Sequence, residues 1–457
     1  MTPKPHGKST SGWLGRRTTR LKSLVVVGTV TLGMAGLGIA AAGPAAADPA
    51  TQYVLNGSDT VQDVDDAFAA AVNLGVLGSW DAVNPVTASP HETITPVKAL
   101  AGGTFSSCSY TRPNGSTEGF NALVKSVFPA TTRPQLAVPP QPGCVDISRS
   151  SSIPGSISNT AGTPGSLDPT GNLIYIPFAM DGMTGATGPT TAGQSTTTKC
   201  VAATPGCMNV DPVTGFGTIT FTVPTTNIAQ ADAFTLANLT SLYNCNTVTV
   251  NGVTYNPVNA GAGQQQIDLY LPQNGSGTLK FWVAALGLPS PLPTCLKQTI
   301  AAGPANGVLV EEHDGAAVAS DPNGYGPFSI AQWVAQSNGH NDRRHTAILH
   351  NIDGIAPLVN GTMNPNIDTQ LKREVYNVMQ YDHAVDNVTA GGPFDSQLNG
   401  LFVSGTLSGG TTTSSLCAHV FTIKSFGFLT LPQPGLPDTC GAFGNQLRVQ
   451  ETNTGPS

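Results

Sequence analysis

One local arrangement recurs along this chain and narrows the choice of fold: an apolar strand, a turn rich in Gly, Ser and Thr, and an amphipathic helix. The clearest case covers residues 269–286 and has its turn at residues 274–278. A helix start leaves unpaired backbone N–H groups at the positive end of the helix dipole. An anion is the natural occupant, so Ser276, Gly277 and Thr278 are candidate ligand residues. A simple Ser/Thr helix cap is the alternative.

A second case lies near the start of the chain. Residues 53–56 read as a strand and lead through Ser58, Asp59 and Thr60 into a helical pattern over residues 61–74. The acidic residues in the first turns of that helix suit its positive end. The alternative is again that Ser58 or Asp59 only caps the helix.

In the third and fourth turns an arginine stands beside the hydroxyl groups. Arg112 precedes a short helix, and Arg149 follows a strand over residues 144–147. The candidate ligands in these two turns are Ser116, Thr117, Ser150 and Ser151. Arginine presents a planar fork of donors that matches an oxyanion, although either arginine could instead be a surface ion-pair partner.

Residues 1–47 have the pattern of a secretory signal peptide. Six Lys or Arg residues precede an apolar run, and Ala45 to Ala47 offer a cleavage site before Asp48. The pair Arg16 and Arg17 leaves the general and the twin-arginine export routes open. No Cys stands at the cleavage site, so we expect no lipid anchor. No apolar run of ~18 residues follows the leader, so we expect a soluble, secreted chain.

Without this leader the chain has 14 basic and 27 acidic residues, a net charge of −13. Such a charge argues against nucleic acid or an anionic membrane as a partner. An anion site must therefore be enclosed and built from backbone dipoles, hydroxyl groups and a few arginines. The length of 457 residues indicates two or three domains.

All eight cysteines follow the leader, which indicates disulfides in an exported chain. Order in the sequence suggests the pairs 108–144, 200–207, 245–295 and 417–440, among roughly a hundred possible pairings. The chain has no CxxC pair, and its histidines at 340, 345 and 350 do not share a helix face. We therefore expect no metal site.

Two further segments indicate crossovers between domains. The apolar run 173–180 reads as a buried strand that ends at the polar residues Asp181 and Gly182. Residues 307–315 and the turn into a helix at residues 326–334 read as the return.

Catalysis has little support in the sequence. A hydrolase elbow of the G-x-S-x-G type has glycines two residues from the serine, whereas the neighbours of Ser276 are Gly275 and Gly277. We see no convincing cluster of carboxylates or histidines for catalytic metals. We therefore expect neither an enzyme nor a cofactor.

The four turns, in this order, resemble the ligand loops of phosphate-binding proteins of ABC importers. The chain looks most similar to divergent secreted members from actinobacteria, whose first loop reads Gly-Ser-Asp-Thr. The resemblance covers about residues 50–380 and is sharpest at residues 276–278. It implies an α/β fold, the two-lobed periplasmic-binding-protein type II fold, with the ligand cleft between the lobes. We expect the first part of lobe 1 over residues 48–180, lobe 2 over residues 181–320, and the return to lobe 1, with a disulfide-containing extension, over residues 321–457.

The resemblance also assigns roles to residues. Asp59 and Thr60 would lie in the first ligand loop, Ser116 would donate from the second, and Ser150 and Ser151 would form the third. The segment from Ser276 to Thr278 would hold the ligand from the opposite lobe. Ser58 and Asp181 complete the candidate set.

Two positions depart from the family pattern. Pro272 stands where the family has an arginine four residues before the serine of its Ser-Gly-Thr motif. Ser151 stands where the family has an aspartate that accepts the phosphate proton. Arg112 or Arg149 could replace the arginine, and Asp59 could replace the aspartate.

The sequence thus predicts an exported, monomeric solute-binding protein that captures phosphate or a related oxyanion and delivers it to an ABC permease. The alternative is a secreted surface or matrix protein that keeps the fold without binding a ligand. If Arg149, Asp59, Ser116 and Ser276 meet at one point, a binder is favoured. If they scatter, or if side chains fill the cleft, the alternative is favoured.

Overall fold

The computed structural model describes residues 51–451, apart from short gaps. These gaps are residues 73–74, 85–86, 88, 100–104, 154–166, 169, 190–193, 202–209, 213, 224–225, 302–306, 386–391 and 408–409. The predicted signal peptide lies outside the described residues, and so does Cys207 of the predicted 200–207 pair.

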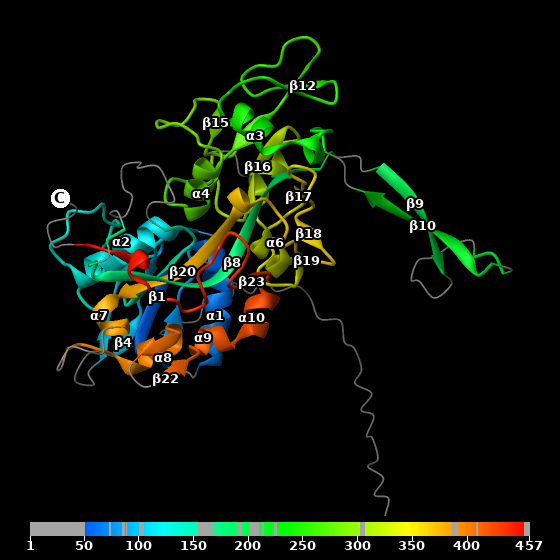
Figure 1. The fold of residues 1–457 in the computed structure, drawn as a ribbon. Helices are drawn as coiled ribbons and strands as arrows, with labels where there is room; N and C mark the ends of the chain where they lie inside the picture. The colour runs from blue at the N-terminus through cyan, green and yellow to red at the C-terminus, as the bar shows by residue number, and fades with distance from the viewer. Residues whose placement is uncertain are drawn as a thin grey trace, which may run out of the picture. The chain divides into compact units, whose positions relative to one another are not determined.

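One mixed sheet runs through this part of the chain, with its main strands in the order β15-β14-β16-β8-β20-β7-β1-β2. At its centre, β8 (Leu173–Thr187) lies antiparallel to β20 (Lys372–Gln380) (Figure 1). The apolar run that predicted a strand over residues 173–180 does form one. The predicted end at Asp181 is wrong, because the strand continues through Asp181 and Gly182 to Thr187.

Two lobes follow from where the apolar side chains gather. A large core contains apolar side chains of β8 between Leu173 and Met180, together with apolar residues of β1, β7 and β20. A second core forms around Met183 of β8, Trp282 and Tyr325, and a smaller one contains Ala186 of the same strand. Since β8 contributes to each core, it connects the lobes of this α/β fold as one continuous strand.

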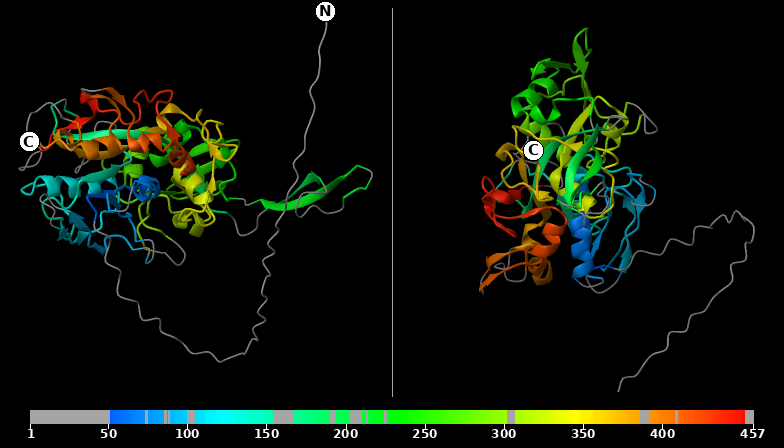
Figure 2. Two further views of the ribbon diagram at one scale, coloured as in Figure 1. Left: turned by 90° about the horizontal axis from the view of Figure 1, so that it is seen from below. Right: turned by 90° about the vertical axis from the view of Figure 1, so that its right-hand side faces the viewer.

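Helices cover the sheet of the first lobe from two sides. Figure 2 shows the C-terminal helices, in orange and red, on one side and the N-terminal segments, in blue and cyan, on the other. The α-helices are α1 (Gln62–Ala71), α2 (Ser116–Val127), α3 (Leu236–Tyr243), α4 (Gly277–Ala285), α5 (Ala316–Ser320), α6 (Ile330–Ser337), α7 (Tyr381–Ala384), α8 (Ser396–Phe402), α9 (Ser415–Ala418) and α10 (Val420–Ser425). Short 3₁₀ helices are η1 (Asp59–Val61), η2 (Ala231–Ala233), η3 (Thr369–Leu371) and η4 (Asn445–Leu447).

The remaining strands of the main sheet are short. They are β1 (Tyr53–Gly57), β2 (Leu77–Ser79), β7 (Ile147–Ser150), β14 (Asp268–Tyr270), β15 (Leu296–Lys297), β16 (Gly324–Ser329), β17 (Ile348–Leu349), β23 (Leu429–Thr430) and β24 (Arg448–Val449). Small sheets contain β3 (Thr93–Ile94), β4 (Val97–Ala99), β5 (Phe105–Ser107), β6 (Tyr110–Thr111), β9 (Gln194–Val201), β10 (Phe216–Val223), β11 (Val248–Val250), β12 (Val253–Asn256), β13 (Gln264–Gln266), β18 (Leu358–Val359), β19 (Thr362–Met363), β21 (Gly405–Leu407) and β22 (Gly410–Thr412).

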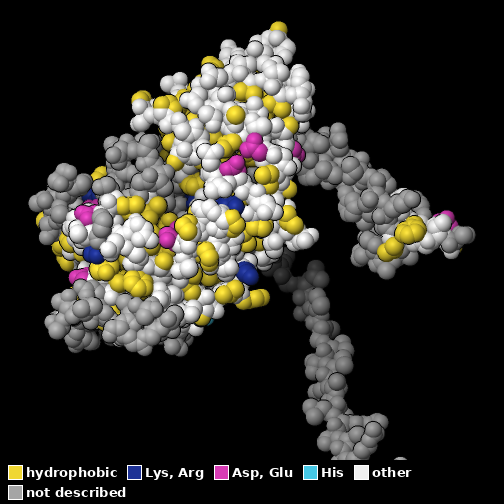
Figure 3. Space-filling view, viewed as in Figure 1, with side chains coloured by type: hydrophobic (Ala, Val, Ile, Leu, Met, Phe, Trp, Pro, Cys, Tyr) yellow, Lys and Arg dark blue, Asp and Glu magenta, His cyan; other side chains and the backbone are white. Residues whose placement is uncertain are grey.

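Three predicted cysteine pairs are confirmed as disulfides: Cys108–Cys144, Cys245–Cys295 and Cys417–Cys440. None of the helices in the described part of the chain is both long enough and apolar enough to span a membrane. On the face in Figure 3, charged side chains are scattered among polar and hydrophobic ones, as expected from a chain with only 10% charged residues.

Candidate functional site

Three of the predicted turns meet at the carboxyl ends of two neighbouring parallel strands. Ser58 follows β1, and Ser151 follows β7, whose Arg149 is the strand partner of Gly57. The Ser58 hydroxyl donates to Ser151 Oγ over 3.1 Å, and Ser116 Oγ lies 3.2 Å from Ser151 Oγ. All three serines are buried. The edge of a parallel sheet is where such groups are expected to gather.

The start of α4 closes on these serines from the second lobe. A Cβ atom built on Gly277 would lie 2.3 Å from Ser151 Oγ and 2.4 Å from Ser116 Oγ. Any larger residue here would require the side chains of Ser116 and Ser151 to shift. Beside it, the Thr117 N–H donates to the carbonyl of Gly275 over 3.2 Å. The fourth turn is therefore brought to the other three.

A second group of side chains is centred on the Thr60 hydroxyl, which is fully buried. Arg373 Nη2 on β20 donates to Thr60 Oγ1 over 3.2 Å and to Thr278 Oγ1 over 3.1 Å. His313 Nε2 lies 2.7 Å from Thr60 Oγ1. The Thr60 hydroxyl in turn donates to Glu312 Oε2 over 3.1 Å. Hydrogen bonds thus run from the arginine and the histidine, through the threonine, to a carboxylate.

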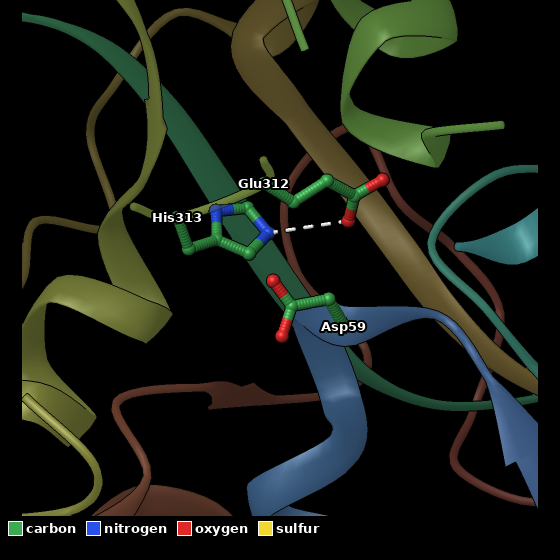
Figure 4. A group of neighbouring side chains, drawn as sticks. All are labelled: Asp59, Glu312 and His313. Carbon is green, nitrogen blue, oxygen red and sulfur yellow. Dashed lines mark ion pairs between the residues drawn. The ribbon is translucent and has the colours of Figure 1, made fainter. Parts of the chain in front are cut away.

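The Glu312 carboxylate also lies at the start of α4. The Thr278 N–H faces Glu312 Oε1 at 3.4 Å, and His313 Nε2 lies 3.5 Å from Oε2 (Figure 4). Burial alone would raise the pKa of Glu312, but the His313 imidazole, the Ser276 hydroxyl and the Arg373 charge outweigh it and lower this pKa to about 2. The carboxylate that faces this helix start is therefore supplied by the chain itself, whereas the sequence predicts an anionic ligand there.

Arg373 is held by Asp181 of β8. Its Nη2 and Nε atoms donate to Asp181 Oδ2 over 2.7 and 3.0 Å, and the Ser329 hydroxyl donates to Oδ1 over 2.8 Å. Both members of the pair are buried. Asp181 therefore acts at this site by orienting the arginine.

Asp59 is paired in a similar way. Arg343 Nη2 donates to Asp59 Oδ1 over 2.8 Å, while Asp59 Oδ2 has no hydrogen-bond partner within the part of the chain that is described. Burial raises the pKa of Asp59 above its ordinary value, although Arg343 opposes the shift. The carboxyl group therefore binds a proton more readily than an exposed aspartate does.

Asp59, Glu312 and His313 are of types that bind divalent metals, and their ligand atoms lie within 4.8 Å of one another (Figure 4). The hydrogen bonds around the ring favour a different use. The Ser329 N–H points to His313 Nδ1 over 3.4 Å, so Nε2 carries the hydrogen that faces Thr60 and Glu312. A metal-bound histidine needs the opposite arrangement, with its second nitrogen donating to an acceptor. The His313 ring is thus oriented to donate to Thr60 Oγ1.

Four candidate residues do not join these groups. Arg149 lies within β7 rather than in the turn after it, so its side chain leaves the sheet on the opposite side from those of its strand neighbours. It donates to Ser79 Oγ and to the carbonyl of Trp80. The placement of Arg149 in a ligand turn is therefore wrong. Arg112 donates to the carbonyl of Asp81, and Ser150 donates to that of Ser152.

The fourth, Thr117, accepts from the ammonium group of Lys280 at the edge of the surface cavity between α2 and residues 274–275. The convergence test therefore has a divided outcome. Ser116 and the Ser276–Thr278 turn meet, and Asp59 adjoins them through His313. Arg149 does not, and the Glu312 carboxylate fills the point of convergence.

Four residues that reach this point were missed in the sequence: Glu312, His313, Arg343 and Arg373. One signal was available for the first two. Residues 311–314 read Glu-Glu-His-Asp directly after an apolar run, in a chain with few charged residues. Arg373 stands between Lys372 and Glu374 at the start of β20, and no spacing rule connects it to a turn nearly one hundred residues away.

No protein-family model and no curated protein matches the chain. Solved structures with similarity include one described as a phosphate ABC transporter substrate-binding protein with bound phosphate, from Clostridium perfringens. It shares 12% identity, covers 84% of this chain and 100% of its own, and has a TM-score of 0.39.

Two other similar structures are PstS from Borrelia burgdorferi and a possible phosphate binding protein from Planctomyces limnophilus. The first shares 12% identity, covers 83% of this chain and 98% of its own, and has a TM-score of 0.33. The second shares 12% identity, covers 73% and 82%, and has a TM-score of 0.28. These similarities are too distant to assign a ligand, so the side chains of the site have to carry the functional conclusion.

Proposed function

We propose that this chain is an exported solute-binding protein that captures phosphate or a related oxyanion between its two lobes, for uptake through an ABC-type permease. It works as a monomer, performs no covalent chemistry and closes around its ligand by a hinge motion. The hinge lies in β8 where this strand passes from one lobe to the other, beside the start of β20.

One observation carries this proposal: donors from separate segments surround a single buried anionic group. The Thr60 hydroxyl and the Thr278 N–H donate to Glu312, and Arg373 and His313 point toward the same place. Preorganised donors in an enclosed site favour an anion despite the acidic net charge of the chain. A phosphate oxygen and a carboxylate oxygen are both hydrogen-bond acceptors, so the same donors can bind either.

A second candidate is a secreted surface protein that keeps the fold without a ligand. The hydrogen bonds from these donors to Glu312 favour this second candidate, because the donors already have an acceptor without any added molecule. The serines at the ends of β1 and β7 also bond to one another. A cleft filled in this way can hold two lobes together permanently.

Calorimetric titration separates the two candidates. Protein recovered from the culture medium, with Asp48 expected as its first residue, is titrated with phosphate and then with sulfate near neutral pH. Micromolar or tighter phosphate binding supports the importer function, and binding of both anions indicates an oxyanion receptor without proton discrimination. If the folded, ligand-free protein binds neither anion, the surface-protein candidate is favoured.

A further inference from the structure

The hydrogen bonds of the Thr60 cluster are directed toward one acceptor. Arg373 Nη2 and the ring N–H of His313 both face Thr60 Oγ1, which leaves the single hydroxyl hydrogen of Thr60 for Glu312. The Thr278 N–H at the start of α4 faces the other oxygen of the same carboxylate. Glu312 therefore occupies the position that an oxyanion needs.

The charges around this position favour only one such anion. Two guanidinium groups, Arg343 and Arg373, already pair with Asp59 and Asp181. The Glu312 carboxylate adds a negative charge to these two pairs, so an oxyanion that entered beside it would meet a like charge at contact distance. If the Glu312 side chain leaves, the charges within the two ion pairs cancel. The ligand then accepts hydrogen bonds from the donors that Glu312 occupied.

The segment that carries Glu312 is anchored at both ends. The Gln273 N–H donates to the Val310 carbonyl over 2.9 Å, and the Gly315 N–H donates to the Arg343 carbonyl over 2.8 Å. Between these anchors, His313 has a φ of 55°, a left-handed conformation that is uncommon for a residue other than glycine. The Glu312 side chain, in contrast, reaches Thr60 of the first lobe, so its bond to Thr60 breaks when the lobes separate.

We propose that Glu312 is a built-in competitor of the ligand. In the absence of ligand it binds the anion donors and holds the two lobes together. An external oxyanion enters only when the Glu312 side chain moves away from Thr60, while its segment stays anchored. This inference rests on the proposed function, because it concerns the same site. Competition by Glu312 sets how tightly that site binds free anions.

The experiment compares Glu312→Gln with the wild type and with Glu311→Gln as a matched control. The substitution at position 312 keeps the shape of the side chain and removes its charge. Glu311 is the adjacent carboxylate, and its Oε2 accepts from Asn114 Nδ2 over 2.8 Å rather than from Thr60. Each protein is titrated with inorganic phosphate and with sulfate. Small-angle X-ray scattering without anion reports the separation of the lobes.

We expect Glu312→Gln to bind both anions about tenfold more tightly or better than the wild type, since a like charge at contact distance is removed. Glu311→Gln should leave the affinity within about twofold. Without anion, Glu312→Gln should have a larger radius of gyration than the wild type. Glu312→Asp keeps the charge on a shorter side chain, so it should show intermediate affinity; it serves as the test variant if the glutamine variant does not fold.

The outcomes separate this inference from the proposed function. If the wild type binds phosphate and Glu312→Gln binds it more weakly or equally well, the competitor role is overturned while the proposed function stands. If only Glu312→Gln binds, the competitor role holds and the wild type is not a carrier under these conditions. If neither folded protein binds an anion, both conclusions fail.

Discussion

At the scale of single residues, burial distinguishes two ion pairs that have the same shortest N–O distance. Arg373–Asp181 and Arg344–Asp342 both have an N–O distance of 2.7 Å. The first pair is almost fully buried, whereas the side chains of the second are 23% and 48% exposed. Water screens the charges of the exposed pair and solvates either residue when the other is removed. Only in the buried pair does removal of one residue leave the charge of the other uncompensated.

We therefore expect Asp181→Asn to lower the free energy of unfolding by about 3–5 kcal/mol. The matched variant Asp342→Asn should change it by less than about 1 kcal/mol. Urea denaturation of both variants at neutral pH, with the disulfides intact, measures the difference. Similar effects of the two substitutions would contradict the role given to Asp181 in holding Arg373.

At the scale of elements, the start of α4 serves two purposes. Ser276 Oγ accepts the Leu279 N–H over 2.9 Å, so the simple cap that the sequence allows is present. A second N–H of the same helix start, that of Thr278, faces the Glu312 carboxylate. Capping and anion binding are therefore compatible, because a helix start has more than one unpaired N–H group.

The variants Ser276→Ala and Thr235→Ala distinguish helix capping from anion binding. Thr235 caps α3, where it accepts the Asn238 N–H, away from the candidate site. Each substitution should lower the free energy of unfolding by about 1 kcal/mol. Only Ser276→Ala should also weaken phosphate binding, by about 1–2 kcal/mol, since a donor to a charged group is lost. Equal affinities of the two variants, measured by calorimetry, would remove Ser276 from the ligand set.

At the scale of the whole molecule, Asp438 of the C-terminal segment lies beside Glu374 of the central sheet. Glu374 on β20 accepts the Tyr376 hydroxyl over 3.0 Å. Burial, followed by the charge of Asp438, raises the pKa of Glu374 from its ordinary 4.5 to about 7. Because the folded state binds this proton more tightly than the unfolded state, the associated stability is present below about pH 4.5 and is lost as the pH rises through about 7.

Glu374→Gln should therefore unfold with a free energy about 1–3 kcal/mol higher than the wild type at pH 8, where the wild type carries a buried charge. At pH 4.5 the two proteins should differ by less than about 0.5 kcal/mol. Guanidinium denaturation at both pH values checks this. A difference that is the same at pH 4.5 and pH 8 would assign the effect to packing instead.

Local patterns were sufficient for much of the fold. Apolar periodicity predicted the strand at the start of β8 and the helix α4, and sequence order predicted three disulfides. These features depend on interactions between residues close in the sequence or on the redox environment of the chain. The role of the site residues stays a prediction until the titrations are made.

The sequence by itself determined the turns that begin helices and the serines and threonines in them, because helix starts and hydroxyl groups are local properties. Only the tertiary structure decided which charges join them. Arg149 is turned away by the two-residue period of β7, and Arg373 arrives on β20 from far along the chain. Glu312 fills the site from a third segment. These long-range contacts depend on how strands pair and how lobes close, so no local sequence pattern predicts them.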